Sequence, residues 1–282
     1  MNFASNTTTA RYLALDVGGT NTKAGIVAAT GGILALNSVD SHPGATRSQV
    51  LADINAALAP FAGEPTAGLG AGFPSFGDFE RGVLDSAVSG YPSMHGFPLR
   101  QHLEDTYGLT TRTVSDASLF AHGILRFGEG RRLSEFITIG LGTGPAIGLV
   151  RAGQVLTGPR GFPDVALRFY TEYGWPAASR HSGFHFSDHY GADPITTHRR
   201  ALAGDAAALR VWRQVGEALA ETISRLSAES GIPDFVIGGG LANAWEFFEP
   251  TLRRQLQPEG INAVKTALPN PSIAGAAALF LV

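Results

Sequence analysis

Apolar residues near the start of the chain come in short runs separated by glycine-rich turns. Runs at residues 12–16, 24–29 and 33–39 favour three antiparallel strands joined by hairpins. Residues 47–62 then carry apolar side chains at the spacing of an amphipathic helix. This opening differs from a dinucleotide-binding fold, in which the first strand leads directly into a helix.

A later part of the chain repeats this plan. Residues 136–139 and 146–151 are apolar runs separated by the turn Gly140–Gly144, and Ala152-Gly153 follows as another turn. The echo predicts two α/β halves built alike. The remaining expected elements are strands at 67–73, 109–114 and 235–237 and helices at 99–107, 117–127, 205–230 and 274–280.

Residues 159–194 break this pattern. The segment is rich in Gly, Pro, His and aromatic residues, and no strand or helix period holds across it, so we expect an irregular loop region. We expect an N-terminal α/β domain over residues 10–116 and a C-terminal α/β domain over residues 117–273. A final helix at 274–282 should pack back on the first domain.

Composition narrows the class of protein. With 282 residues, of which 44% are hydrophobic, the chain can bury a large core. The net charge of −3 argues against a nucleic-acid partner. No apolar run approaches the ~20 residues of a membrane span, and the polar start lacks the features of a secretion signal, so we expect a cytoplasmic protein. The absence of cysteine excludes disulfides, thiolate metal sites and cysteine nucleophiles.

The strongest signal for chemistry is the turn Asp16-Val17-Gly18-Gly19-Thr20-Asn21-Thr22-Lys23. Glycines let backbone N–H groups approach phosphates, and the Thr20 and Asn21 side chains add donors. Lys23 supplies a positive charge, and Asp16 can orient a magnesium ion through its waters. An ordinary glycine-rich hairpin is the alternative, but the carboxylate at the strand end favours phosphate binding.

Two more glycine turns follow expected strands. Gly140-Leu141-Gly142-Thr143-Gly144 stands at the equivalent place in the second half, so a polyphosphate can be clamped between two Gly–Thr turns. Gly238-Gly239-Gly240 suits close approach of the backbone to adenine or ribose, and a tight strand–helix turn is its alternative explanation.

In chain order, these motifs resemble those of ROK-family sugar kinases, from Tyr12 onward. The resemblance is carried by Asp16–Lys23, Gly72-Phe73-Pro74, Phe97-Pro98-Leu99-Arg100, Ser115-Asp116, Gly142-Thr143-Gly144 and Ile237–Gly240. It implies an actin-like (ribonuclease H-like) fold of two α/β domains with a nucleotide cleft between them. It also implies phosphorylation of a sugar hydroxyl with ATP and Mg²⁺, and a possible homodimer. Some family members are repressors with an N-terminal helix-turn-helix, for which the eleven residues before the first strand leave no room.

By position, the resemblance makes Asp116 the catalytic base. A carboxylate at a strand end can accept the proton of a hydroxyl, a poor nucleophile, as the γ-phosphoryl group transfers. Capping the helix that starts at Ala117 is an alternative role, compatible with the first. The expected nucleotide and phosphate contacts are Asp16, Gly18, Gly19, Thr20, Asn21, Lys23, Gly142, Thr143, Gly144, Gly239 and Gly240. The expected acceptor contacts are Gly72, Ser93, His95, Ser115 and Asp116.

Other positions depart from the family pattern. Ser115 stands where Asn precedes the catalytic Asp, Ser75 replaces a Gly, and the loop expected to carry Pro-Asn reads Tyr91-Pro92-Ser93. The Ala-Gly-Glu-x-Gly-His element that holds sugar hydroxyls is replaced, and Pro159–Val165 follows Gly158. The cysteine-rich zinc motif is missing, so we expect no structural zinc.

The phosphate motifs are thus kept while the sugar-reading groups change. An unpaired polar group in a buried site costs about 1–3 kcal/mol, so either the acceptor is unlike glucose or turnover is lost. We expect an ATP-dependent kinase of a sugar or sugar-like polyol. The alternatives are a catalytically silent nucleotide- or sugar-binding sensor, and a kinase with a non-sugar acceptor or a polyphosphate donor.

The replacement segment has its own candidates for reading the acceptor: Asp164, Arg168, Glu172, Arg180, His181, His185, Asp188 and His189. Three of its histidines stand four residues apart, which on a helix would place them on one face, able to hold a metal. Loop histidines without a metal are the alternative, and Gly183 speaks against a helix.

Overall fold

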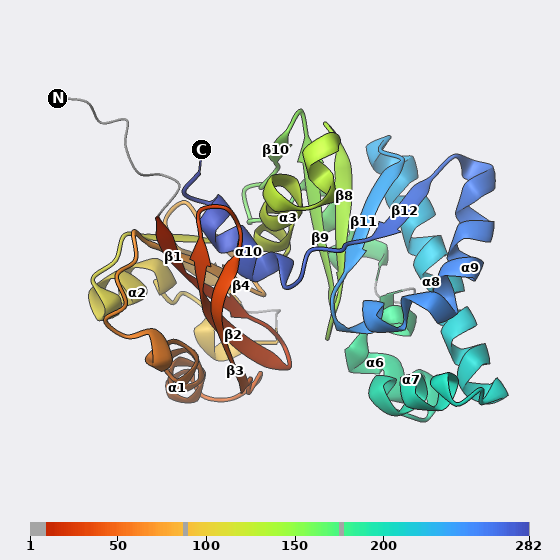
Figure 1. Cartoon of the computed structure of the whole chain (residues 1–282), viewed down its shortest axis with the longest axis horizontal. Helices are drawn as coiled ribbons and strands as arrows, with labels where there is room; N and C mark the ends of the chain where they lie inside the picture. Colours follow the sequence, from red (N-terminus) through yellow and green to blue (C-terminus); the bar gives the residue numbers. More distant parts are fainter. Residues whose placement is uncertain (1–9, 87–89, 175–177, 282) are drawn as a thin grey trace.

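The computed structural model describes residues 10–86, 90–174 and 178–281 and contains two five-stranded sheets (Figure 1). The strands of the first are β1 (Arg11–Val17), β2 (Asn21–Ala28), β3 (Ile33–Asp40), β4 (Leu69–Phe73) and β7 (Thr111–Ser115). Their order is β3-β2-β1-β4-β7. β1, β2 and β3 pair antiparallel, whereas β1, β4 and β7 run parallel. The hairpins predicted at the start of the chain are therefore confirmed.

The second sheet repeats the first. Its strands are β8 (Phe136–Leu141), β9 (Pro145–Arg151), β10 (Gln154–Val155), β11 (Asp234–Gly238) and β12 (Asn262–Lys265). The order is β10-β9-β8-β11-β12, with β8, β9 and β10 antiparallel and β8, β11 and β12 parallel. The predicted internal repeat is thus confirmed in strand order and direction. A small hairpin of β5 (Phe76–Asp78) and β6 (Val83–Asp85) was not predicted.

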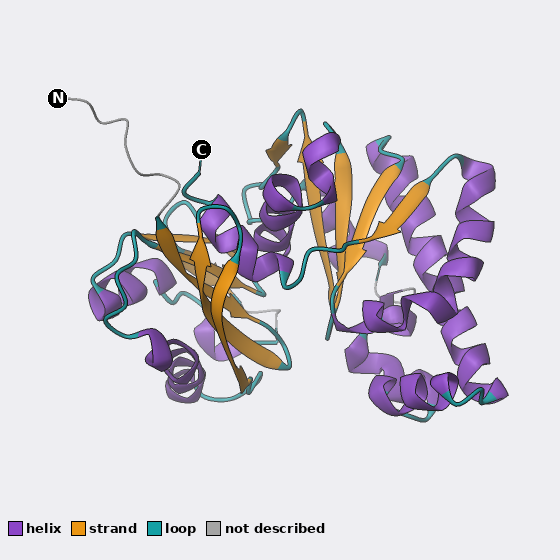
Figure 2. Cartoon of the chain, in the orientation of Figure 1, coloured by secondary structure: helices purple, strands orange, loops and turns teal. Residues whose placement is uncertain are grey.

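Helices cover both sheets (Figure 2). They are α1 (Arg47–Leu58), α2 (Leu99–Tyr107), α3 (Asp116–Phe127), α4 (Asp164–Arg168), α6 (Gly183–Tyr190), α7 (Pro194–Leu202), α8 (Ala206–Ser230), α9 (Trp245–Leu256) and α10 (Pro271–Ala278). The predicted long helix is α8, which begins where Asp205 accepts from the N–H groups of Ala207 and Ala208. It ends at Gly231, whose φ of 73° is left-handed.

Two helices, α3 and α10, lie between the sheets (Figure 1). α10 packs against β1, β2 and β4, α3 packs against β8 and β9, and the two helices contact each other. A Cβ atom at Gly123 of α3 would overlap the backbone of Pro271, and one at Gly275 of α10 would overlap the backbone of Leu119. The glycines therefore let the two helix backbones touch, which brings the edges of the two sheets close together.

The region 159–194 is not the irregular loop that we predicted. It contains α4, a short π-helical turn at Phe169–Tyr173, a 3₁₀ turn at Ser179–His181 and α6. Phe169 and Phe186 from this region are fully buried in the core of the second half. Periodicity failed because these helices are shorter than the window over which a helical repeat can be recognised. No helix in the described ranges is long and apolar enough to cross a bilayer.

Candidate active site

Two carboxyl groups lie at one edge of the first sheet. Asp16 of β1 is beside Gly72 of β4, and Asp116 directly follows β7. Because β1, β4 and β7 are parallel, their carboxyl ends share an edge, and the charge of Asp16 acts on Asp116. Both side chains are partly exposed. The geometry therefore places the two predicted acidic residues together.

Burial raises the pKa of both carboxyl groups. The pKa of Asp116 rises from 3.8 to about 7, mainly through burial and then through the negative charge of Asp16. Burial also raises the pKa of Asp16 from 3.8 to about 6, against the opposing effects of Lys23 and a hydrogen bond with Ser272. Two carboxylates with one neighbouring lysine fit an additional cation at this edge.

Asp116 does not cap its helix, so that alternative is wrong. The cap of α3 is Ser115, whose Oγ accepts from the N–H of Ser118 at 3.2 Å. Asp116 is the first helical residue, and its Oδ1 accepts from the N–H of Ala117 at 2.9 Å. A carboxylate has a second oxygen, so this bond leaves Asp116 able to accept a proton.

In the first glycine turn, the carbonyl groups are held by the protein. The carbonyl of Gly18 accepts from the Tyr91 hydroxyl at 2.6 Å, and that of Thr20 accepts from the N–H of Ser41 at 2.9 Å. The carbonyl of Asn21 accepts from the N–H of Gly18 at 3.0 Å. Within the described part of the chain, the N–H groups of Gly19 and Thr20 have no acceptor. They are free to bind an anion.

The second turn has the same arrangement. The carbonyls of Gly142 and Thr143 accept from the N–H groups of Gly183 and Phe184, at 2.8 and 2.9 Å. The carbonyl of Gly144 accepts from the N–H of Gly142 at 3.3 Å. No acceptor among residues 10–86, 90–174 and 178–281 binds the N–H groups of Thr143 and Gly144. Each turn therefore offers two successive backbone donors.

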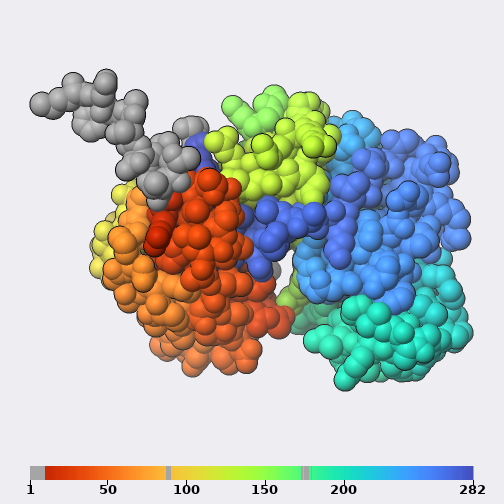
Figure 3. Space-filling model, viewed as in Figure 1, coloured from red at the N-terminus to blue at the C-terminus, as the bar shows by residue number. Residues whose placement is uncertain are grey.

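The two turns touch each other across the cleft. The hydroxyl oxygens of Thr20 and Thr143 are 2.7 Å apart, and a Cβ atom at Gly19 would lie 2.8 Å from the Cβ of Thr143. Figure 3 shows the surface hollowed between the first sheet, in red, and the later part of the chain, in blue and teal. The predicted pair of facing Gly–Thr turns is therefore present in the structure.

The third glycine turn lies beside the second. Gly239 has a φ of +91°, and a Cβ atom there would be 2.5 Å from the carbonyl oxygen of Leu141. Gly240 has open space around its missing Cβ. Gly239 thus lets the turn pack against the end of β8, while Gly240 faces free volume.

Lys23 and Asn21 take different positions from those of the glycines. Lys23 pairs with Asp16 across β1 and β2, and its Nζ donates to Oδ1 of Asn270 at 3.3 Å. Asn270 precedes α10 with a left-handed φ of 44°, which is strained for a residue with a side chain. Asn21 is exposed at the start of β2. Lys23 therefore connects the acidic edge to the start of α10.

The predicted acceptor contacts are only partly brought together. Ser115 is fully buried, and its hydroxyl is 2.9 Å from the carbonyl oxygen of Gly161, so it holds the replacement loop and does not face the cleft. Gly72 is buried too, and a Cβ atom there would be 2.7 Å from the Leu119 side chain. The glycine therefore lets α3, which begins at Asp116, pack against β4. Both residues thus contact other parts of the protein next to Asp116.

Ser93 and His95 lie farther out, on the loop between β6 and α2. The Ser93 hydroxyl donates to the carbonyl of Ala45 at 2.8 Å. His95 is 3.2 Å from Asp85, which in turn pairs with Arg160 at 3.1 Å. Arg160 belongs to the replacement loop, which is the part of residues 159–194 that follows Gly158. The contacts through Asp85 therefore join the loop that carries Ser93 and His95 to the replacement loop.

Aromatic rings fill the place next to these charged residues. The Arg160 guanidinium lies 4.2 Å from the ring centre of Phe76, and Phe76 packs edge-on against Phe162. Tyr170 contacts both phenylalanines, and burial, followed by the charge of Asp116, raises the pKa of its phenol. Phe162 and Tyr170 of the replacement loop therefore form an apolar wall with Phe76, where the family resemblance predicts polar groups.

The charged and histidine residues of 159–194 point mostly elsewhere. Arg168 pairs with Glu229 at 3.1 Å, and Arg180 pairs with Glu221, so both bind α8. His181 is buried, outside the helix that carries the other two histidines, with its Nε2 2.9 Å from the Thr222 hydroxyl. No group of three or more potential ligand side chains for a metal occurs among the described residues.

Four residues at the site were missed by the sequence analysis: Ser41, Tyr91, Tyr170 and Ser272. They come from separate segments and carry no motif that a reader of the sequence could recognise. The Asn-Pro step before Ser272 is the one usable signal, because it is typical of a turn that begins a helix.

Known proteins with related sequences and folds are mainly sugar kinases. The chain is 25% identical over 276 residues to a glucokinase of Thermotoga maritima, covering 87% of each chain. A glucokinase of Streptomyces griseus, solved with glucose and AMPPNP, superimposes with a TM-score of 0.84 at 22% identity, covering 95% of this chain and 98% of that one. A transcriptional regulator homologous to the Mlc protein of E. coli superimposes with a TM-score of 0.78 at 17% identity, covering 98% and 78%.

These matches confirm the expected actin-like α/β fold. The relatives include glucokinases, and a related regulator has the same fold, so fold alone does not decide activity. The profile of the ROK family matches residues 12–164, more than half of the chain. The chain therefore belongs to the ROK family.

Proposed function

We propose that this protein is a kinase that transfers the γ-phosphoryl group of ATP to a hydroxyl of a sugar or sugar-like polyol. One observation carries the proposal. Two glycine turns touch through Thr20 and Thr143, carry backbone N–H groups that have no acceptor among the described residues, and adjoin the strand ends that bear Asp16 and Asp116. An array of this kind suits a polyphosphate and a proton acceptor together.

In this proposal, the first turn binds phosphate through the N–H groups of Gly19 and Thr20, and the second through those of Thr143 and Gly144. Asp16 holds Mg²⁺ through water, which fits its place in an acidic pair that Lys23 offsets in part. The ion, when bound, screens the charge of the phosphate oxygens. Gly240 borders the nucleoside, because the space beside its Cα is open.

Asp116 acts as the general base. A pKa near 7 suits proton transfer at neutral pH, because the carboxylate is both populated and basic enough to accept a hydroxyl proton. The neighbouring phenol groups do not donate their protons to Asp116. Tyr91 donates its proton to Gly18, and Tyr170 donates its proton to the carbonyl of Pro145 at 2.9 Å.

The test is ADP release from Mg·ATP with a panel of sugars, amino sugars and polyols. We expect turnover that depends on the acceptor and falls by about 10²–10⁴-fold in Asp116→Asn, which keeps the shape of the side chain but cannot accept the proton. Undiminished turnover in that variant would show that Asp116 is not the base. Repeating the panel with polyphosphate in place of ATP decides the donor.

The second candidate is a sensor that binds nucleotide or sugar without turnover. It is favoured by the apolar wall of Phe76 and Phe162, and by the use of the Ser115 hydroxyl to hold the replacement loop. A sensor of this kind would bind Mg·AMPPNP, yet the panel would give no ADP above the rate without acceptor. Burst or steady release with any acceptor contradicts it.

A further inference from the structure

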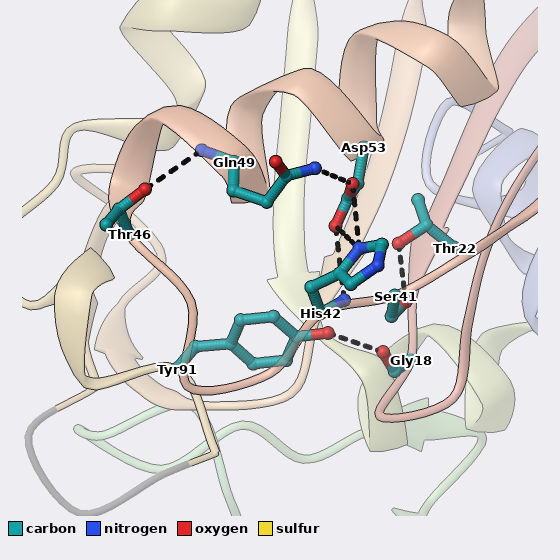
Figure 4. A network of polar contacts seen from close by, with 8 residues as sticks. All are labelled: Gly18, Thr22, Ser41, His42, Thr46, Gln49, Asp53 and Tyr91. Atoms are coloured by element: carbon teal, nitrogen blue, oxygen red, sulfur yellow. Dashed lines mark hydrogen bonds and ion pairs between the residues drawn. The ribbon is translucent and has the colours of Figure 1, made fainter.

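The peptide between Gly18 and Gly19 is held by the hydroxyl group of Tyr91 (Figure 4). Tyr91 donates to the carbonyl of Gly18 at 2.6 Å. Ser41 hydrogen-bonds to Tyr91 and opposes the rise in phenol pKa that burial causes, as a donor to the phenol oxygen does. The hydroxyls of Thr22 and Ser41 are 2.8 Å apart. The hydroxyl groups of Thr22, Ser41 and Tyr91 thus gather beside the carbonyl of Gly18.

The bond from Tyr91 to the Gly18 carbonyl decides where one phosphate donor, the N–H of Gly19, points. In a trans peptide the C=O and the next N–H point in opposite directions. A Gly18 carbonyl fixed toward Tyr91 therefore turns the N–H of Gly19 away from Tyr91. In the second turn, the N–H groups of Gly183 and Phe184 hold the carbonyls in the same way. Tyr91 is the counterpart in the first turn, but it acts through a side chain.

Tyr91 also begins the loop that contains Ser93 and His95. Its side chain is only 2% exposed, and its ring packs against Phe73 with the centres 5.1 Å apart. Burial raises the pKa of its phenol, and the charges of Asp53 and Asp116 add smaller contributions. One rigid side chain thus connects the phosphate turn to the start of the acceptor loop.

We propose that Tyr91 is a positioning residue that couples the acceptor loop to the first phosphate-binding turn. The inference rests on the proposed function, because it assumes that phosphate binds the N–H of Gly19. A movement of the loop that displaces the phenol frees the Gly18 carbonyl, and the peptide then loses the orientation that phosphate needs. A bound acceptor that holds the loop in place keeps Tyr91 on the Gly18 carbonyl. The Gly18–Gly19 peptide then has the orientation that binds nucleotide.

The first test compares Tyr91→Phe with Tyr107→Phe. Both remove one phenol hydroxyl, but that of Tyr107 donates to Asn55 at 2.8 Å on an exposed surface. We expect calorimetry to give an affinity for Mg·AMPPNP about three- to tenfold weaker in Tyr91→Phe and unchanged in Tyr107→Phe. Ser41→Ala should weaken it in the same direction, because it removes the donor to the phenol and keeps the backbone N–H.

The second test asks whether the loop is coupled. Ser93→Ala removes the bond to Ala45, one of the bonds that hold the loop, and leaves those from Arg47 to the carbonyls of Ser93 and His95. We expect it to weaken Mg·AMPPNP in the wild-type background but to add nothing in Tyr91→Phe, as coupled residues do in a double-mutant cycle. Equal losses in both backgrounds would overturn the coupling.

Each remaining outcome is also decisive. If Tyr91→Phe melts at a lower temperature but binds Mg·AMPPNP as Tyr107→Phe does, the phenol supports only the fold, and the inference is wrong. If the wild-type protein binds and Tyr91→Phe binds equally well, the inference alone fails. If the wild-type protein does not bind Mg·AMPPNP, the proposed function fails and the inference fails with it.

Discussion

At the scale of single residues, the acidic pair opposes folding at neutral pH. Asp116 has a pKa near 7 in the folded protein against 3.8 for an exposed aspartate, so the folded state binds more protons between these values. The stability that this carboxyl group contributes is therefore fully present below about pH 4 and is lost as the pH rises toward 7. Burial is the main cause of this loss, and a bound cation would offset the smaller part that comes from the charge of Asp16.

Asp116→Asn should consequently stabilise the protein. At pH 8 and in EDTA, we expect the free energy of unfolding in denaturant to rise by about 1–3 kcal/mol, because the amide cannot ionise beside Asp16. At pH 4.5 the difference should be smaller, since Asp116 is then protonated in the folded state and less of its contribution has been lost. A stabilisation that is the same at both pH values would contradict the assigned pKa.

At the scale of elements, the third glycine turn contains two glycines with different roles. Packing requires Gly239, whereas we propose that Gly240 borders the nucleoside. Gly239→Ala places a side chain at φ +91° and 2.5 Å from Leu141, so we expect a loss of about 2 kcal/mol or more of unfolding free energy. Gly240→Ala meets no atom within 4 Å and should leave stability within about 0.5 kcal/mol.

Nucleotide binding completes this comparison. If Gly240 borders the nucleoside, Gly240→Ala should raise the KM for ATP several-fold in a fully folded protein. A variant that keeps both its melting temperature and its KM would remove Gly240 from the proposed binding site.

The helices of residues 159–194 belong to the core and cannot be deleted without loss of the fold. Phe186 of α6 is fully buried, with its ring 5.3 Å from that of Trp212, whereas Phe184 of the same helix is 70% exposed. We expect Phe186→Ala to lower the unfolding free energy by about 3–5 kcal/mol, and Phe184→Ala by less than about 0.5 kcal/mol. Similar losses in the two variants would show that α6 is not packed as described.

The same contrast shows what a sequence can predict. The strands of both halves and the helix α8 were recognisable because their signals are local and repeated: apolar runs, glycine turns and caps. The glycine turns were found for the same reason. Tyr91 and Ser41 were not, because their role depends on topology, which brings residues 18, 41 and 91 together. Short helices such as α4 were missed since five residues make little more than one turn.

At the scale of the molecule, α3 and α10 form the contact that joins the two halves of the chain. We propose that residues 10–116 and 117–273 behave as two domains, joined where the backbones of these helices touch. The Thr20–Thr143 contact and the Asp85–Arg160 pair then hold the cleft shut on either side of Asp116. Nucleotide can enter between the turns only if the first of these contacts opens.

Locking that contact should therefore block the nucleotide. The chain has no cysteine, so the double variant Thr20→Cys/Thr143→Cys can form only one disulfide within a molecule. The hydroxyl oxygens that the sulfurs would replace are 2.7 Å apart, which is close enough for a bond after a small adjustment. We expect the oxidised protein to lose binding of Mg·AMPPNP and to regain it in dithiothreitol, while each single variant binds under both conditions. A disulfide verified by the loss of free thiols, together with unchanged binding, would mean that phosphate does not pass between the turns, and the assignment of Thr20 and Thr143 to the phosphate site would be wrong.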